Sequence, residues 1–180
     1  MSPSFFEKPI LNSPYAYPAR HWELDADGQP TNRIIEARRL AEFITPIPRS
    51  KKRKSNASQQ EIVFDEAKVV STDRQRYEKT AAMINTVRLH VDKWRMLPDA
   101  SDWKVTPETA RLLQHWRHYK FNDARPFFCQ IEAAETAIWL SEVAPTLGKS
   151  AAEILEYLDA ASENANPGVS RLALKLATGA

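Results

Sequence analysis

Two stretches in the last third of the chain decide how the rest is interpreted. Residues 121–133 read Phe-Asn-Asp-Ala-Arg-Pro-Phe-Phe-Cys-Gln-Ile-Glu-Ala, and residues 172–180 read Leu-Ala-Leu-Lys-Leu-Ala-Thr-Gly-Ala. We expect the first stretch to open a helix over residues 126–143, with Gln130 in its second turn. The second stretch alternates leucine with other residues, as a strand does, before it becomes small and glycine-containing. This alternation predicts a strand over residues 169–176.

The end of the second stretch has the composition with which a phosphate-binding loop begins. In a P-loop, a strand is followed by a glycine-rich turn, a Gly-Lys pair and a Ser or Thr that opens a helix. Backbone amides of the turn hold the phosphates, the lysine reaches the terminal phosphates and the hydroxyl holds magnesium. We expect Thr178, Gly179 and Ala180 to begin such a loop, with Gly-Lys-Thr next. A flexible end rich in small residues would have the same composition.

The residues upstream favour the nucleotide-binding interpretation. The strings Arg125-Pro126 and Gln130-Ile131-Glu132-Ala133 resemble the short helix with Arg-Pro and Gln-x-x-Ala that precedes the P-loop strand in superfamily 2 helicases. Residues 121–141 together with 171–180 resemble more closely the large Res subunit of type III restriction enzymes and its DEAD/DEAH-like relatives. The commonest form of this motif is Arg-Pro-Tyr-Gln, whereas three residues separate proline from glutamine in this chain.

The start of the chain resembles the same proteins. The similar strings are Leu11-Asn12-Ser13-Pro14-Tyr15, Arg20-His21-Trp22-Glu23-Leu24 and Arg33-Ile34-Ile35-Glu36-Ala37-Arg38-Arg39. The resemblance implies that Gln130 reads the adenine edge, because one carboxamide both accepts from and donates to a purine. It also implies that Arg125 is a further nucleotide contact.

The resemblance carries expectations about the parent protein. It implies an α/β P-loop (RecA-like) helicase fold, with ATP and Mg²⁺ as cofactors that the fragment alone does not bind tightly. The implied partners are double-stranded DNA and a DNA-methyltransferase (modification) subunit. The fragment itself is expected to be mainly helical, with its C-terminal strand as the first of a parallel sheet. Alone it is expected to be inactive, because the P-loop lysine and metal-binding hydroxyl would lie beyond Ala180.

Composition bounds the class of protein. The chain has 180 residues, of which 43% are hydrophobic, and this is enough for the core of one ordinary domain. No apolar run approaches the roughly 20 residues of a membrane helix, and the N-terminus lacks a signal-peptide pattern. The single cysteine, Cys129, excludes an internal disulfide and suits a reducing cytosol. We therefore expect a cytoplasmic protein without a membrane partner.

Positive charge is concentrated in the front of the chain. Residues 1–120 carry 21 Lys and Arg against 15 Asp and Glu, whereas residues 121–180 carry 4 against 8. Residues 49–70 begin with a polar, unpatterned run that cannot bury enough apolar area to order itself, so a flexible loop is expected. The basic residues at the start of this loop are Arg49, Lys51, Lys52, Arg53 and Lys54. Contact with DNA phosphates and a solvated charge run explain this loop equally well.

The remaining segments divide around that loop. Residues 1–48 contain many aromatics and prolines, which predicts an extended arm with a turn at residues 25–28. Residues 71–120 are predicted to hold two helices, and residues 121–180 to begin the ATP-binding domain. The first helix should start at about Ser71, with a capping box formed by Thr72 and Gln75, end before Pro98, and bury one face. That face comprises Tyr77, Ala81, Ile84, Val87, Val91 and Trp94.

The second of these helices should open at Thr106-Pro107, since proline is favoured at the first helical position. Its predicted buried stripe is Leu112, Leu113, Trp116 and Tyr119. His115 and His118 lie three residues apart, but no nearby ligand completes a metal site, so partly exposed histidines beside aromatic residues are the better interpretation.

A different function class competes with the enzyme part. The chain also fits a self-contained helical module that binds DNA or protein through its basic loop and helix faces, without catalysis. One observation separates the two classes. The codons after Ala180 either continue into Gly-Lys-Thr or meet a stop codon.

Overall fold

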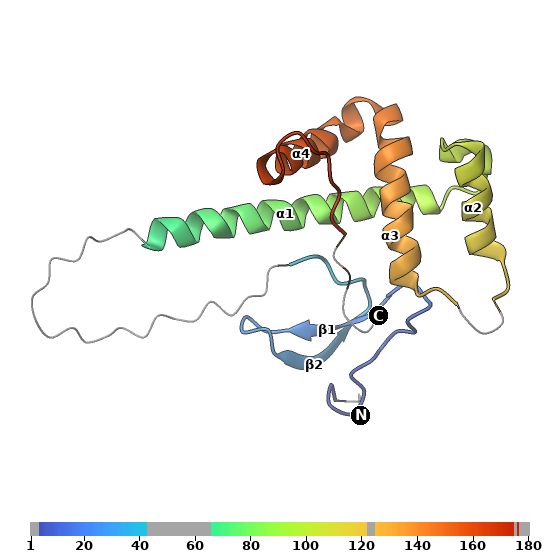
Figure 1. Cartoon of the computed structure of the whole chain (residues 1–180). Coiled ribbons are helices and arrows are strands. Elements are labelled where there is room, and N and C mark those ends of the chain that lie inside the picture. Colours follow the sequence, from blue (N-terminus) through green and yellow to red (C-terminus); the bar gives the residue numbers. More distant parts are fainter. Residues whose placement is uncertain (1–3, 43–65, 122–124, 175, 177–180) are drawn as a thin grey trace, which may run out of the picture. The chain divides into compact units, whose positions relative to one another are not determined.

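The computed structural model describes residues 4–42, 66–121, 125–174 and 176. In these ranges the chain is mainly helical, which confirms the expected fold class at that level (Figure 1). The four longer helices are α1 (Glu66–Arg95), α2 (Pro107–His118), α3 (Phe128–Ile138) and α4 (Lys149–Ala165). Among the described helices, none combines the length and the apolar composition that crossing a bilayer requires.

The chain divides into two compact units, and the boundary between them falls within α1. The first unit comprises residues 1–11 and 20–84, and the second comprises residues 12–19 and 85–180. The short segment 12–19 therefore belongs with the helices of the second unit, although residues on both sides of it belong to the first.

An antiparallel hairpin lies in the first unit, where an extended arm was predicted. Strands β1 (His21–Leu24) and β2 (Pro30–Ile35) pair through a turn in which Gly28 has φ of 80°. The Asp25 carboxylate accepts the Asp27 and Gln29 amides at 2.9 and 2.8 Å, which fixes the turn. The predicted turn is confirmed. The strands were missed because both are short and lie among prolines, where periodicity carries little signal.

Trp22 anchors this hairpin. Its side chain is 6% exposed, and its indole nitrogen donates to the Lys8 carbonyl at 3.2 Å. Phe5 packs edge-on against it, with ring centroids 5.9 Å apart. Asn32 has φ of 60°, a conformation that asparagine tolerates, and its side-chain oxygen accepts the Phe5 amide at 2.9 Å. These contacts hold the aromatic N-terminal residues on the hairpin.

Helix α1 ends at Arg95, before Pro98, as predicted, but it begins at Glu66 rather than at Ser71. The predicted capping box is therefore inside the helix, which begins with the good helix formers Glu66, Ala67 and Lys68. The apolar face is buried only in its second half. Val87, Val91 and Trp94 are 8%, 1% and 4% exposed, whereas Tyr77 and Ile84 are 44% and 42% exposed.

Helix α2 opens at Thr106-Pro107 as predicted. The Thr106 hydroxyl accepts the Thr109 amide at 3.3 Å. The predicted buried stripe is wrong in part: Leu113 is fully buried, but Leu112 and Tyr119 are 50% and 55% exposed. The inward residue one turn after Leu113 is Arg117, which pairs with a buried carboxylate.

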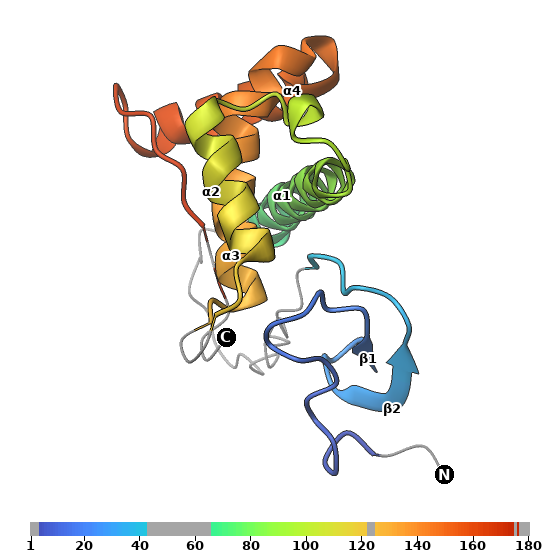
Figure 2. The same cartoon turned by 90° about the vertical axis from the view of Figure 1, so that its right-hand side faces the viewer.

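Helix α3 continues the chain without a break into a π-helical turn, η2 (Trp139–Val143), and a 3-10 turn, η3 (Ala144–Leu147). The predicted helix to about Val143 is thus confirmed in outline. Trp139, Val143 and Ala144 are each at most 3% exposed and form the centre of the second unit's core. Figures 1 and 2 show the second half of α1 crossing α2 and α3.

The predicted C-terminal strand is wrong for the residues that the structure describes. Residues 169–174 and 176 form an irregular segment, and Val169, Leu172, Leu174 and Leu176 are 45–46% exposed. The Ser162 hydroxyl holds this segment against the end of α4, since it donates to the Val169 carbonyl and accepts the Arg171 amide. A strand needs a neighbour to receive its backbone hydrogen bonds, and the described chain provides none beside these residues.

The Glu142 carboxylate, which binds the N-terminus of α2, should make the stability of the fold depend on pH. Glu142 accepts the Thr106 amide and the Thr109 hydroxyl, both at 2.7 Å, and these hydrogen bonds lower the pKa of its carboxyl group. A lowered pKa stabilises the fold above the pKa of the unfolded chain, about 4.3, and this contribution is lost as pH falls through the folded value. We expect Glu142→Gln to reduce the free energy of unfolding more at pH 7 than below pH 4.

Urea denaturation followed by circular dichroism at a series of pH values measures this difference. Glu156→Gln is the matched control, because Glu156 is exposed on α4. Equal pH dependence in the two variants would contradict the role assigned to Glu142.

Candidate functional site at the start of α3

Two of the predicted nucleotide-binding residues lie at the start of α3, five positions apart in the sequence. Arg125 and Gln130 are both exposed there. Thr178, Gly179 and Ala180 lie outside the described residues, and so does the basic run Arg49, Lys51, Lys52, Arg53 and Lys54. The structure therefore describes the residues predicted to contact adenine and does not describe those predicted to contact phosphate.

Gln130 caps its own helix. Phe127 precedes α3 in an extended conformation, and its amide donates to the Gln130 side-chain oxygen at 2.9 Å. This bond satisfies one of the amides that a helix start leaves without an intrahelical partner. A carboxamide oxygen has a second lone pair, and its NH₂ group carries two donors. Capping therefore leaves Gln130 able to accept and donate once more toward a ligand.

Beside Gln130, a stack of planar groups forms around Tyr15. The Arg125 guanidinium lies over the Tyr15 ring, 5.0 Å from its centroid, and the Phe127 ring stacks on Tyr15 at 5.3 Å and 28°. Tyr15 is 39% exposed. The sequence analysis quoted Tyr15 within the N-terminal resemblance but gave it no role. Only the fold brings it beside Arg125, from 110 residues away.

The segment that carries Tyr15 is fixed to the helix start by backbone and side-chain contacts. The Phe128 amide donates to the Pro14 carbonyl at 2.9 Å. Tyr17 packs edge-on against the Phe128 ring at 5.6 Å, and its hydroxyl donates to the Asp92 carboxylate at 2.9 Å. Residues 12–19 are thus held between α3 and the end of α1.

A buried carboxylate lies two turns into α3, below the exposed cluster. Glu135 is 1% exposed, and both of its oxygens are paired. Arg95 Nε donates to Oε2 at 2.6 Å, while Arg117 donates to Oε1 through Nη2 at 2.9 Å and Nε at 3.2 Å. Sequence patterns missed this residue, because a glutamate in an apolar helix is usually assigned to the solvent side.

Arg95 connects this carboxylate to the start of α3. Burial by itself lowers the pKa of Arg95, but the charges of Glu135, Asp92 and Glu132 outweigh it and the pKa is raised. Its guanidinium also lies over the Phe128 ring, 5.2 Å from the centroid. The charged form is therefore secured, and one cation touches both the buried Glu135 and the aromatic base of the candidate site.

Arg117 connects the same carboxylate to two tryptophans, Trp94 and Trp103. Its guanidinium lies 4.5 Å from the Trp103 ring centroid and 5.5 Å from that of Trp94. The Trp94 indole donates to the Trp103 carbonyl at 2.9 Å, and the Trp103 indole donates to the Leu97 carbonyl at 3.0 Å. The ends of α1 and α2 are therefore tied to one carboxylate.

The side chains at the start of α3 can form hydrogen bonds and stacking contacts. A carboxamide, a guanidinium and stacked aromatic rings present hydrogen-bonding and π surfaces to a planar ligand. Within the ranges that the structure describes, no three His, Cys, Asp or Glu side chains are placed to hold a metal ion. Comparison with family models, curated proteins and solved structures finds no match to this chain.

The buried pairing predicts a large effect on stability. Glu135→Ala leaves two arginines partly buried without their shared carboxylate, and breaking such a pairing typically costs about 3–5 kcal/mol. We expect the free energy of unfolding, measured by urea denaturation at pH 7, to fall by about that amount.

Glu108→Ala is the matched control. Glu108 pairs with Arg111 at 3.3 Å, but these side chains are 71% and 75% exposed, so its loss should cost under about 1 kcal/mol. Similar losses of stability in the two variants would contradict the stabilising role assigned to Glu135.

Proposed function

We propose that this chain is the N-terminal part of an ATP-dependent DNA helicase or translocase and restriction endonuclease subunit, similar to type III Res. In this proposal the start of α3 recognises adenine, and Thr178, Gly179 and Ala180 begin the phosphate-binding loop. The observation that carries it is the exposed Gln130 in the first turn of α3, with the exposed Arg125 five residues before it.

The geometry supports adenine as the ligand. Adenine presents an amino donor at N6 beside an acceptor at N7, and a carboxamide meets both at once. The capping bond from the Phe127 amide restrains the Gln130 oxygen, whose second lone pair accepts from N6 while the NH₂ group donates to N7. The Arg125 guanidinium and the Phe127 ring both stack on Tyr15, which holds the Arg125 donors at the helix start.

The rest of the proposal depends on the sequence resemblance. ATP and Mg²⁺ would be held by residues 178–180 and by a lysine and a hydroxyl beyond them, which supply the charge stabilisation of phosphoryl transfer. Double-stranded DNA and a methyltransferase subunit are the proposed partners. The codons that follow Ala180 test this directly, because the proposal requires them to encode Gly-Lys-Thr.

Gln130 should set the choice of nucleotide in the complete protein. Guanine presents a carbonyl at O6, so one hydrogen bond of the carboxamide stays unmade, which costs about 1–3 kcal/mol in a dry site. The wild type should prefer ATP over GTP by about tenfold or more in kcat/KM, and Gln130→Ala should lose most of that preference.

Two further variants separate recognition from capping. Gln130→Glu keeps an oxygen for the Phe127 amide but has no NH₂ group for N7, so it should retain the fold and lose the preference. Gln75→Ala removes a glutamine that is also exposed, on α1, and should change neither. An ATP preference that survives in Gln130→Glu would make Gln130 a helix cap only.

The basic loop has its own expected outcome. If residues 49–54 bind DNA, they do so through phosphates, and neutralising about five phosphates implies a log–log salt slope of roughly −4 to −5. Replacing Lys51, Lys52, Arg53 and Lys54 with serine should flatten the slope and weaken binding to duplexes of any sequence.

Removal of an equal charge elsewhere provides the control. Lys93, Lys104, Lys120 and Lys149 are exposed on the helical unit, and changing all four to serine alters net charge identically. Fluorescence anisotropy over a salt series gives the slopes. Equal slopes in the two variants would mean that residues 49–54 are a solvated charge run that does not contact DNA phosphates.

A further inference from the structure

Residues 12–19, which we call the strap, belong to the second unit, although the chain enters and leaves them through the first. The Arg20 guanidinium donates through Nη2 to the Leu11 carbonyl at 3.1 Å, so the two ends of the strap are joined directly. Three residues before Leu11, the Lys8 carbonyl accepts the Trp22 indole of the hairpin. The base of the strap is therefore continuous with the contacts that order the hairpin.

The tip of the strap is held by directed contacts rather than by burial. Tyr15 and Tyr17 are 39% and 43% exposed. The Tyr17 hydroxyl donates to the Asp92 carboxylate at 2.9 Å. The Pro14 carbonyl accepts the Phe128 amide, also at 2.9 Å. Exposed segments of this kind open locally at a lower free energy than the core does, so we expect the strap to release while the helices stay folded.

Release of the strap would change the surroundings of a predicted ligand-binding residue. The Arg125 guanidinium lies over the Tyr15 ring, 5.0 Å from its centroid, and its Nη2 is 3.5 Å from the Tyr15 carbonyl oxygen. Both contacts would be lost on release. Gln130 would keep its bond to the Phe127 amide, because both residues belong to the helix start. The docked strap therefore acts on Arg125 and leaves Gln130 as it is.

We propose that the strap couples the order of the hairpin to the arrangement of the start of α3. An ordered hairpin favours the docked strap, and by thermodynamic linkage a docked strap favours the ordered hairpin. A ligand that binds Arg125 more tightly in the docked arrangement would also stabilise the hairpin. This last consequence rests on the proposed adenine site, whereas the coupling itself does not.

Three hydrogens report on the two ends of this coupling. The Phe128 amide is the first of α3 and has no intrahelical acceptor, so its protection depends on the Pro14 carbonyl. The neighbouring Phe127 amide is bound by Gln130 and shows whether the helix start itself has frayed. The Trp22 indole N–H reports on the hairpin. Hydrogen exchange followed by NMR on the 180-residue chain measures all three without a ligand.

Tyr17→Phe keeps the ring and removes only the hydroxyl that binds Asp92. It should speed exchange of the Phe128 amide by roughly three- to tenfold, the factor that corresponds to one hydrogen bond. The Phe127 amide should be unchanged. Exchange of the Trp22 indole should also become faster, by a smaller factor, because the hairpin keeps its own contacts.

The reverse effect starts from the hairpin. Phe5→Ala removes the ring that packs on Trp22 and should speed exchange of the Trp22 indole. Because coupling is reciprocal, it should also speed exchange of the Phe128 amide. Arg20→Met opens the base of the strap. In that background, Phe5→Ala should still act on Trp22 but no longer on Phe128.

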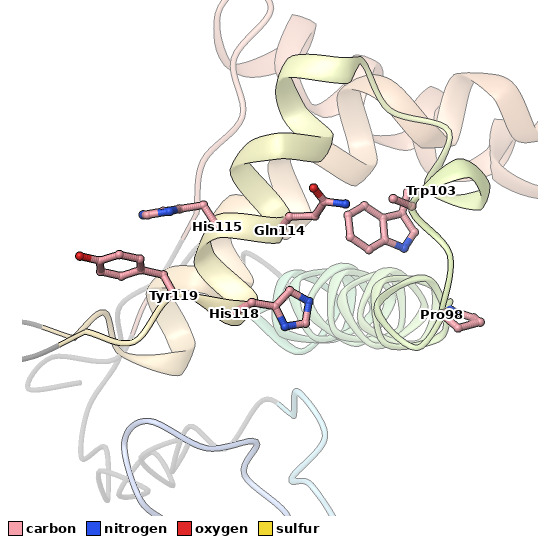
Figure 3. Close-up of a pocket in the computed structure, with 7 residues that line it drawn as sticks. Pro98, Trp103, Gln114, His115, His118 and Tyr119 are labelled. Carbon is pink, nitrogen blue, oxygen red and sulfur yellow. The ribbon is translucent and has the colours of Figure 1, made fainter.

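Tyr119→Phe is the matched control. Tyr119 is 55% exposed, and Figure 3 shows its hydroxyl directed away from α2. This variant should leave all three reporters unchanged. An unchanged Phe128 amide in Tyr17→Phe would overturn the proposal. So would effects that stay within one unit in both Tyr17→Phe and Phe5→Ala.

ATP separates the strap from the proposed function. In the complete protein, saturating ATP should slow exchange of the Trp22 indole, and Arg20→Met should abolish this effect. Binding of ATP, measured by calorimetry, without slower exchange at Trp22 would contradict regulation through the strap. Reciprocal effects of Tyr17→Phe and Phe5→Ala in a protein that binds no ATP would support the coupling and contradict the adenine site.

Discussion

The second unit depends on the burial of one carboxylate. Removing a charge from water costs several kcal/mol unless partners compensate for it, so Glu135 requires both Arg95 and Arg117. These two arginines belong to different helices, and the requirement therefore fixes the end of α1 and the rotation of α2 relative to α3. The exposure of Leu112 and Tyr119 follows, because the face of α2 that carries Arg117 must turn inward.

The same constraint reaches the candidate site. Arg95 lies over Phe128, and Phe128 receives Tyr17 on its edge and holds Pro14 through its backbone amide. Residues 12–19 are positioned by these contacts, so the placement of Tyr15 beside Arg125 depends on the ionic cluster below it. A chain segment more than 100 residues away in sequence thereby becomes part of the start of α3.

Sequence patterns correctly predicted the features that depend on only a few neighbouring residues. Thr106-Pro107, the turn at Gly28 and the end of α1 before Pro98 were predictable, because caps, positive φ and proline act within a few residues. Glu135 was not, since its burial depends on two arginines that approach only in the fold. The leucine alternation after Val169 shows the converse error, because a strand pattern forms no strand without a neighbour. In the candidate site, Arg125 and Gln130 were named from sequence, and Tyr15 was found only by tertiary packing.

The exposed glutamines Gln130 and Gln114 differ in how their side chains are held. Gln130 is held by the Phe127 amide, so a ligand that meets its carboxamide has less rotamer freedom to remove, out of about 1.5–2 kcal/mol for a free glutamine. Gln114 has no such restraint in the described structure, and a ligand there must order it. The nearby Trp103 is 4% exposed and its ring is covered by the Arg117 guanidinium, so it offers a ligand no open face. Hydrogen-bond discrimination by a glutamine is therefore better supported at the start of α3 than on α2.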